Sequence, residues 1–253
     1  VPLGAALPAL LTADEGASSG PLEIASWEAY DELVDQQWGG VAGEPSAPGW
    51  AAAMFLWRAA AEKKWLFSRE DLRPLIDQKP YVQALDLMVR TNDRYQTKRQ
   101  TPDQVWSAIN AGELKGAIGM PLGRTDSEGE FQIGNVPGVT AMSKVRLDPF
   151  MPVVSMSANC RQSDVAKRFI GWISGGEGSD GVRQQVVGMS EVRRRGSGQE
   201  RSASEDRSSY DRWLANRLSS PVTAPTLQLF RAGDYYSVLD DQVGRALNGE
   251  ASP

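Results

Sequence analysis

The sequence predicts an α/β fold in which a mixed sheet is flanked by helices and the carboxyl-terminal part is helical. Short apolar segments bounded by glycine and proline alternate with amphipathic segments of helical spacing, and the segments toward the end are mainly helical. The composition agrees with this class. Of the 253 residues, 41% are hydrophobic and 23% are charged, as in an ordinary globular protein with a sizeable core.

The amino-terminal segment predicts a strand followed by a helix. Residues 1–11 are apolar and interrupted by proline and glycine, which is typical of an extended segment that leads into a strand. Ser26 is expected to cap a helix that reaches about Trp38, with Glu28 in the first turn, where the positive end of a helix favours an acid. Gly39-Gly40 then ends this helix.

A second helix is predicted to begin at Trp50, after a loop from Gly43 to Gly49. Its apolar stripe recurs at i, i+4, i+7 and i+11 and consists of Trp50, Met54, Trp57 and Ala61. A third helix is expected roughly from Tyr81 to Arg90, because Pro80 suits the start of a helix. Its buried face is expected to hold Val82, Leu85 and either Met88 or Val89.

The clearest helix signals surround Thr101. Thr101 can cap the helix, Pro102 takes its first position, Gln104 can close a capping box and Gly112 stops it. The remaining predicted elements are strands from Lys115 to Met120 and Phe131 to Val136, a buried strand from Val153 to Ser157, a helix from about Asp164 to Ser174 capped by Ser163, and helices at Asp180 to Val187, Tyr210 to Leu218 and Tyr235 to Leu247. Residues 191–209 are polar and are predicted to be mobile.

No catalytic machinery is visible in the sequence. The chain has no histidine and one cysteine, which removes Ser-His-Asp and Cys-His catalysis and histidine-ligated zinc. Cys160 is expected to be a buried, inert thiol at the end of an apolar strand. The neighbouring acids Asp240-Asp241 and Glu205-Asp206 diverge on a helix and are expected on its solvated surface. The sequence therefore predicts a ligand-binding protein without cofactor or metal, and not an enzyme.

The net charge and the hydropathy of the sequence limit the classes of partner that the protein can bind. The net charge of −5 argues against nucleic acid or an anionic membrane as the main partner. We expect no bilayer-spanning segment, because no apolar run approaches the ~20 residues that span a bilayer. We also expect no secretory signal within these residues, because the chain does not open with a basic segment.

Six segments, taken in order, carry a resemblance to a known family: Val1 to Gly4, Ser26 to Tyr30, Phe67 to Leu85, Thr101 to Pro121, Asp164 to Ser174 and Tyr235 to Pro253. In order and spacing they resemble the extracellular solute-binding proteins of bacterial ABC importers. This is the type II periplasmic-binding-protein group, which includes many sugar binders. The resemblance implies a periplasmic or extracellular protein that hands its solute to ABC permease subunits, with membrane contact only through an upstream lipid anchor.

The resemblance also implies a domain arrangement. Residues 1–187 would form an α/β lobe of the carboxyl-terminal type, entered from the hinge, and residues 188–253 would form the hinge return and the closing helices. Relatives carry an amino-terminal lobe before the segment that matches Val1 to Gly4, so this chain is expected to hold only one wall of the cleft and to bind weakly by itself.

The ligand residues that the resemblance implies are Trp50, Met120, Ser190, Arg193 and Arg194. Trp50 follows Pro48-Gly49 at a helix start where family members point into the cleft, and aromatic faces stack on sugars. Met120 occupies the place of a cleft tryptophan in relatives and offers a soft apolar contact. Ser190, Arg193 and Arg194 match a cleft loop. For the arginines, a solvated basic loop is the alternative interpretation and the more common one.

Two functional hypotheses follow. The leading one is an ABC-importer binding protein whose solute is a carbohydrate. The alternative is a ligand-sensing or protein-interaction module on the same fold without a transport role. Most of the other tryptophans are expected to pack in the core, namely Trp27, Trp38, Trp57, Trp106, Trp172 and Trp213.

Overall fold

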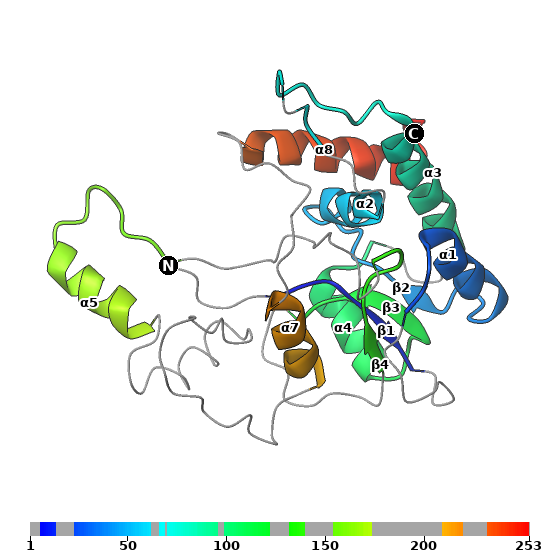
Figure 1. Cartoon of the computed structure of the whole chain (residues 1–253), viewed down its shortest axis with the longest axis horizontal. Helices are drawn as coiled ribbons and strands as arrows, with labels where there is room; N and C mark the ends of the chain where they lie inside the picture. The colour runs from blue at the N-terminus through cyan, green and yellow to red at the C-terminus, as the bar shows by residue number, and fades with distance from the viewer. Residues whose placement is uncertain are drawn as a thin grey trace.

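The computed structural model describes residues 6–13, 23–61, 66–68, 70–95, 99–121, 132–139, 154–173, 209–219 and 232–252. Within these ranges it is an α/β fold, as predicted (Figure 1). The strands are β1 (Ala9–Thr12), β2 (Ala42–Gly43), β3 (Gly116–Gly119) and β4 (Gln132–Gly134). The helices are α1 (Trp27–Gln36), α2 (Ala51–Ala60), α3 (Lys79–Arg94), α4 (Pro102–Asn110), α5 (Ser163–Ile173), α7 (Ser209–Ser219) and α8 (Ala232–Leu247).

The four strands form one mixed sheet in the order β2-β3-β1-β4. β1 is antiparallel to β3, with Leu10 opposite Ile118, and antiparallel to β4, with Leu11 opposite Ile133. β2 pairs with β3 in parallel through Ala42 and Gly116. All residues of β1 and β3 are buried, so their continuous apolar runs reflect burial of both faces of the sheet.

Helices cover the sheet and form a second layer beyond it (Figure 1). α4 packs against β3 and α7 against β4, whereas α2 packs against both α3 and α8. The Tyr210 hydroxyl on α7 donates to the Leu7 carbonyl at 2.7 Å and accepts from the Leu7 N–H at 2.9 Å. These two buried bonds attach α7 to the chain just before β1.

The local helix signals are confirmed. The Ser26 side chain accepts from the Ala29 N–H at the start of α1. At α4, the Gln104 N–H donates to the Thr101 side chain, and the Gln104 side chain accepts from the Thr101 N–H, which is a complete capping box. Gly112 follows α4 with a φ of +71°, the left-handed conformation that favours glycine.

Several predicted details are wrong. α3 is longer than expected, and its buried face holds Tyr81, Ala84 and Met88, whereas Val82 is 40% exposed. Residues 154–157 do not form a strand, and Met156 is 38% exposed. An apolar run becomes a strand only where a partner strand completes its hydrogen bonds, and none of the described strands pairs with these residues. Cys160, which follows, is partly exposed and not buried.

α5 lies apart from the other labelled elements (Figure 1). Val165, Phe169 and Trp172 follow one another on one side of it and are 60%, 51% and 37% exposed. The prediction that Trp172 packs in a core is therefore wrong in this chain, whereas it is correct for Trp27, Trp38, Trp57 and Trp106. The predicted helix at 180–187 lies outside the described residues, and so does the segment 191–208.

Candidate functional site

Trp50 lies at the corner where the chain turns into α2. Gly49 precedes it with a φ of +88°, so the turn requires a residue without a Cβ atom. The Trp50 N–H donates to the Ala47 carbonyl at 2.9 Å, and the Trp50 carbonyl accepts from the Met54 N–H at 3.0 Å. The side chain is partly exposed and packs along the edge of the hydrophobic core. Trp50 therefore combines a fixed backbone with a ring that is accessible in part.

The amino terminus of α2 is capped by a residue from the other end of the chain. The Gly49 N–H donates to Asp240 Oδ2 at 2.6 Å, and the Ala52 N–H donates to Asp240 Oδ1 at 3.0 Å. Asp241, the next residue of α8, is exposed. The expectation that both acids lie on a solvated helix surface is thus correct for Asp241 and wrong for Asp240. No local signal could have revealed this cap, because its partners are about 190 residues apart.

Aromatic side chains gather at the start of α8. Tyr235 packs against Phe67 with ring centroids 4.9 Å apart and against Tyr236 at 6.0 Å. Within the described part of the chain, the buried Tyr235 hydroxyl has no hydrogen-bond partner. Burial raises the pKa of Tyr235, and it raises the pKa of nearby Tyr81 to about 12. Because this hydroxyl is shielded from solvent, only the exposed part of the Tyr235 ring is available to stack on a ligand.

The other predicted ligand residues are less accessible or lie outside the description. Met120 follows β3 at the edge of the sheet, where its side chain is fully buried in the core. Ser190, Arg193 and Arg194 lie outside the described residues. Of the five predicted residues, Trp50 alone is described as partly exposed, and the assignment of all five to a site stays a prediction.

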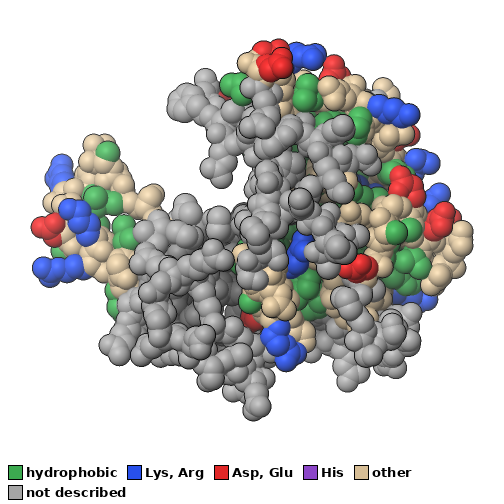
Figure 2. Space-filling view, in the orientation of Figure 1, with side chains coloured by type: hydrophobic (Ala, Val, Ile, Leu, Met, Phe, Trp, Pro, Cys, Tyr) green, Lys and Arg blue, Asp and Glu red, His purple; other side chains and the backbone are tan. Residues whose placement is uncertain are grey.

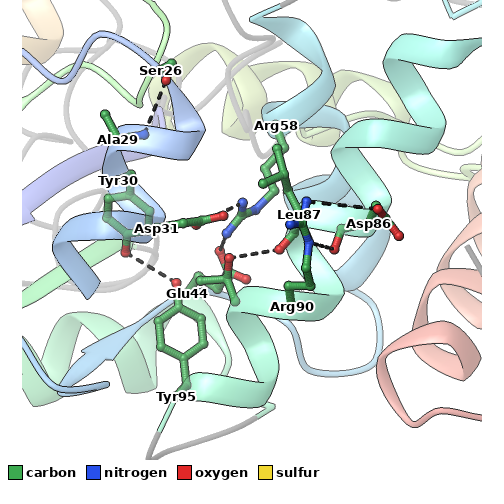
Figure 3. A network of polar contacts seen from close by, with 11 residues as sticks. Ser26, Ala29, Tyr30, Asp31, Glu44, Arg58, Asp86, Leu87, Arg90 and Tyr95 are labelled. Atoms are coloured by element: carbon green, nitrogen blue, oxygen red, sulfur yellow. Dashed lines mark hydrogen bonds and ion pairs between the residues drawn. The ribbon is translucent and has the colours of Figure 1, made fainter. Parts of the chain in front are cut away.

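A buried network of charges fixes α2 against α1 (Figure 3). Arg58 on α2 donates from Nη2 to Glu44 Oε2 at 2.9 Å and from Nη1 to Asp31 Oδ1 at 3.4 Å. The exposed fractions of these three side chains are 1%, 0% and 8%. The Arg58 guanidinium also lies 4.4 Å from the ring centroid of Trp27. The network was not predicted, since nothing in the local sequence pairs these residues.

The charge states in this network follow from burial and proximity. Burial raises the pKa of Glu44 and that of Asp31 above their usual range, although Arg58 opposes the rise. Burial lowers the pKa of Arg58, but Glu44 and Asp31 together raise it by more, so the guanidinium stays protonated. Two acids around one base suit a structural anchor, because Arg58 and Glu44 are shielded from solvent and Asp31 is only 8% exposed.

A hollow with a volume of about 360 Å³ lies between α1 and α3. It is lined by Glu28, Asp31, Glu32, Gln83, Asp86, Leu87, Arg90 and Arg94. The lining contains no aromatic side chain, so this hollow does not offer the stacking surface that a sugar site uses. Among the described residues, no three His, Cys, Asp or Glu side chains come together to hold a metal ion.

Comparison with known proteins identifies the fold. No protein-family model and no curated protein sequence matches the chain. Among solved structures, an ABC-transporter solute-binding protein from Agrobacterium radiobacter in complex with ribitol has a TM-score of 0.71 at 12% identity, over 100% of this chain and 67% of that one. Maltose-bound MalE3 of T. maritima has a TM-score of 0.67 at 14% identity, over 100% and 68%.

A third solved structure is an ABC-transporter solute-binding protein from Agrobacterium vitis with bound D-mannitol. Its TM-score is 0.65 at 13% identity, over 99% of this chain and 68% of that one. The chain thus spans about two thirds of the length of these solved proteins. At these identities the likeness concerns the fold, and it extends over the whole chain. The chain has the type II periplasmic-binding-protein fold that its sequence predicted.

Proposed function

We propose that this chain is part of the solute-binding protein of an ABC importer. In this proposal the protein captures a carbohydrate or polyol between two lobes and delivers it to permease subunits in the membrane. One observation carries the proposal, namely the match of the whole fold to solved binding proteins with bound ribitol, maltose and D-mannitol. These neighbours are binding proteins and not enzymes, which supports a role without catalysis.

The proposed protein acts in the periplasm or outside the cell, tethered by an upstream lipid anchor if it is not free. Within the described ranges, no helix is both long and apolar enough to cross a membrane. Residues 1–187 supply one lobe of the carboxyl-terminal type and residues 188–253 return through the hinge. An amino-terminal lobe, encoded upstream, supplies the opposite wall of the cleft.

The exposed apolar side of α5 is evidence for a further lobe in the full-length protein. Val165 and Phe169 are exposed on the same helix as the ion pair between Lys167 and Asp164, and Figure 2 shows hydrophobic side chains beside charged ones at this place. An amphipathic helix normally buries its apolar side. The predicted amino-terminal lobe is the surface that would cover it, since about a third of each matched protein lies outside the match.

This cover can be tested in the full-length protein, the natural polypeptide that contains these residues. In this chain Phe169 is 51% exposed, and the proposed lobe would bury that exposed half. Phe169→Ser should therefore lower the unfolding free energy of the full-length protein by about 1 kcal/mol, because this apolar contact with the lobe is lost. Val238→Ser on α8 is the matched control, because Val238 is 63% exposed and no second lobe is proposed to cover it. Equal, negligible changes in both variants would show that the α5 face stays uncovered.

The proposed ligand contacts are Trp50 and the predicted residues Met120, Ser190, Arg193 and Arg194. We add the ring of Tyr235, which is partly exposed at the start of α8. The test is a thermal-shift titration of the full-length protein with ribitol, D-mannitol and maltose. At 100 times Kd, a bound ligand stabilises the folded state by about 2.7 kcal/mol, which shifts the melting temperature by several degrees. No shift with sugars or polyols would refute the proposal.

The second candidate is a sensing or protein-interaction module on the same fold. The apolar face of α5 also favours this role, because exposed apolar surface of this kind binds other proteins. A gene neighbourhood without permease and ATPase genes, together with an absence of sugar binding, would select it.

A further inference from the structure

We infer that Asp240 is a positioning residue for Trp50, so that the last helix of the chain sets the geometry of the ligand site. The inference rests on the proposed function, in which Trp50 contacts the solute. Asp240 itself need not touch the ligand. Its role is to fix the turn from which the Trp50 ring projects.

Asp240 accepts hydrogen bonds from the backbone on both sides of Trp50. One carboxylate oxygen of Asp240 accepts from the Gly49 N–H, immediately before Trp50, at 2.6 Å. The other oxygen accepts from the Ala52 N–H, two residues after it, at 3.0 Å. A single carboxylate therefore bonds to the backbone on both sides of the tryptophan. Because α2 packs directly against α8, the carboxylate is delivered by a rigid neighbour.

Tryptophan is an unusual residue at the N-cap position of a helix. Trp50 occupies the N-cap position of α2, and its side chain makes no capping hydrogen bond. Serine, threonine, aspartate and asparagine are preferred there, because their side chains satisfy the free N–H groups of the first turn. α2 lacks that local cap and receives one from Asp240 instead. The arrangement keeps an aromatic ring at the corner while the helix start remains satisfied.

Loss of the Asp240 carboxylate should make the turn from Gly49 to Ala52, which carries the Trp50 ring, more mobile. The ligand would then have to order the Trp50 ring on binding, and that cost appears as weaker affinity. An N-cap is worth about 1 kcal/mol, so Asp240→Ala should weaken binding about fivefold. Asp240→Asn keeps one acceptor oxygen and should give a smaller loss.

The matched control is Asp241→Ala. Asp241 is the next residue on the same helix, is exposed and accepts a hydrogen bond from Gln242. This variant removes the same charge from nearly the same place and should leave affinity unchanged. A similar loss in both variants would assign the effect to net charge and overturn the inference.

A double-mutant cycle separates positioning from a general structural effect. The affinity of the full-length protein for ribitol, D-mannitol and maltose is measured by calorimetry in wild type, Asp240→Ala, Trp50→Phe and the double variant. If Asp240 acts through Trp50, its roughly fivefold effect disappears in the Trp50→Phe background. An undiminished effect in that background would overturn the inference while leaving the proposed function intact.

A second measurement needs no ligand. Acrylamide quenching of tryptophan emission should increase in Asp240→Ala, and the increase should be absent when Trp50 is replaced by phenylalanine. Unchanged quenching in Asp240→Ala refutes the positioning role even if no sugar binds. Absence of sugar binding by the wild-type protein refutes the proposed function instead, so the two failures are distinguishable.

Discussion

Replacement of Arg58 by leucine should be among the most damaging single changes in this chain. Leucine keeps much of the packing beside Trp27 but leaves Glu44 and Asp31 without their cation. Glu44 is 0% exposed, so bulk water does not reach it, and Asp31 is 8% exposed beside the hollow between α1 and α3. Removal of one partner from a buried ion pair costs about 3 to 5 kcal/mol. We expect a loss of that size in the unfolding free energy of Arg58→Leu.

The assay is urea unfolding of the full-length protein followed by far-ultraviolet circular dichroism. Arg90→Leu is the control, because the Arg90–Asp86 pair spans 4.0 Å between side chains that are 62% and 58% exposed. An exposed pair of this kind contributes less than about 0.5 kcal/mol. Equal, small losses in the two variants would refute the view that the Arg58 network anchors α2 to α1.

The pH dependence of the Arg58→Leu variant gives a further check. Burial already raises the pKa of Glu44 and Asp31, and removal of the guanidinium raises both further. Protonation then removes the uncompensated charge as the pH falls. The deficit of Arg58→Leu should therefore shrink as the pH falls through the raised pKa values of these two carboxyl groups, whereas a deficit caused by lost packing would stay constant.

Three other predictions concern stability. Tyr210→Phe should cost about 1 to 3 kcal/mol in chemical denaturation, because the buried Leu7 N–H loses its acceptor; an unchanged midpoint would contradict this. Gly112→Ala should lower the melting temperature, because Gly112 has a φ of +71°, which strains residues with a Cβ atom. Gly171→Ala on α5 should leave the melting temperature unchanged or raise it, because a Cβ atom there meets no neighbour. A lower melting temperature for Gly171→Ala than for Gly112→Ala would contradict this. The unfolding free energy of wild type relative to Glu44→Gln should rise as the pH falls through the raised pKa of Glu44, because the folded state then binds a proton more tightly than the unfolded state. A relative stability that falls instead would show that the effect of Arg58 on the pKa of Glu44 outweighs that of burial.

The elements that the sequence predicted well are those fixed by neighbouring residues. The capping box of α4 involves residues three positions apart, and Ser26 caps α1 over the same distance. Their hydrogen bonds are decided within one turn, whatever the rest of the chain does. The strands β1 and β3 were equally visible, because a fully buried strand is a continuous apolar run.

The features that the sequence could not reveal depend on distant partners. The Asp240 cap joins α8 to α2, and the Arg58 network joins α2 to α1 and to Glu44. An acid or arginine in a helical segment is usually solvated, and only the packed fold distinguishes the exceptions. The same limit applies to Trp172, whose helical spacing predicted burial although its helix has no described partner for that face.

The most direct test of the central claim is a sugar and polyol titration that follows tryptophan emission in the full-length protein. We predict a saturable change with at least one of ribitol, D-mannitol and maltose, and about tenfold weaker binding in Trp50→Phe. Trp57→Phe, on the same helix but 8% exposed, should bind as wild type does. No saturable change with any of these ligands, or equal effects of the two substitutions, would contradict a solute site at Trp50.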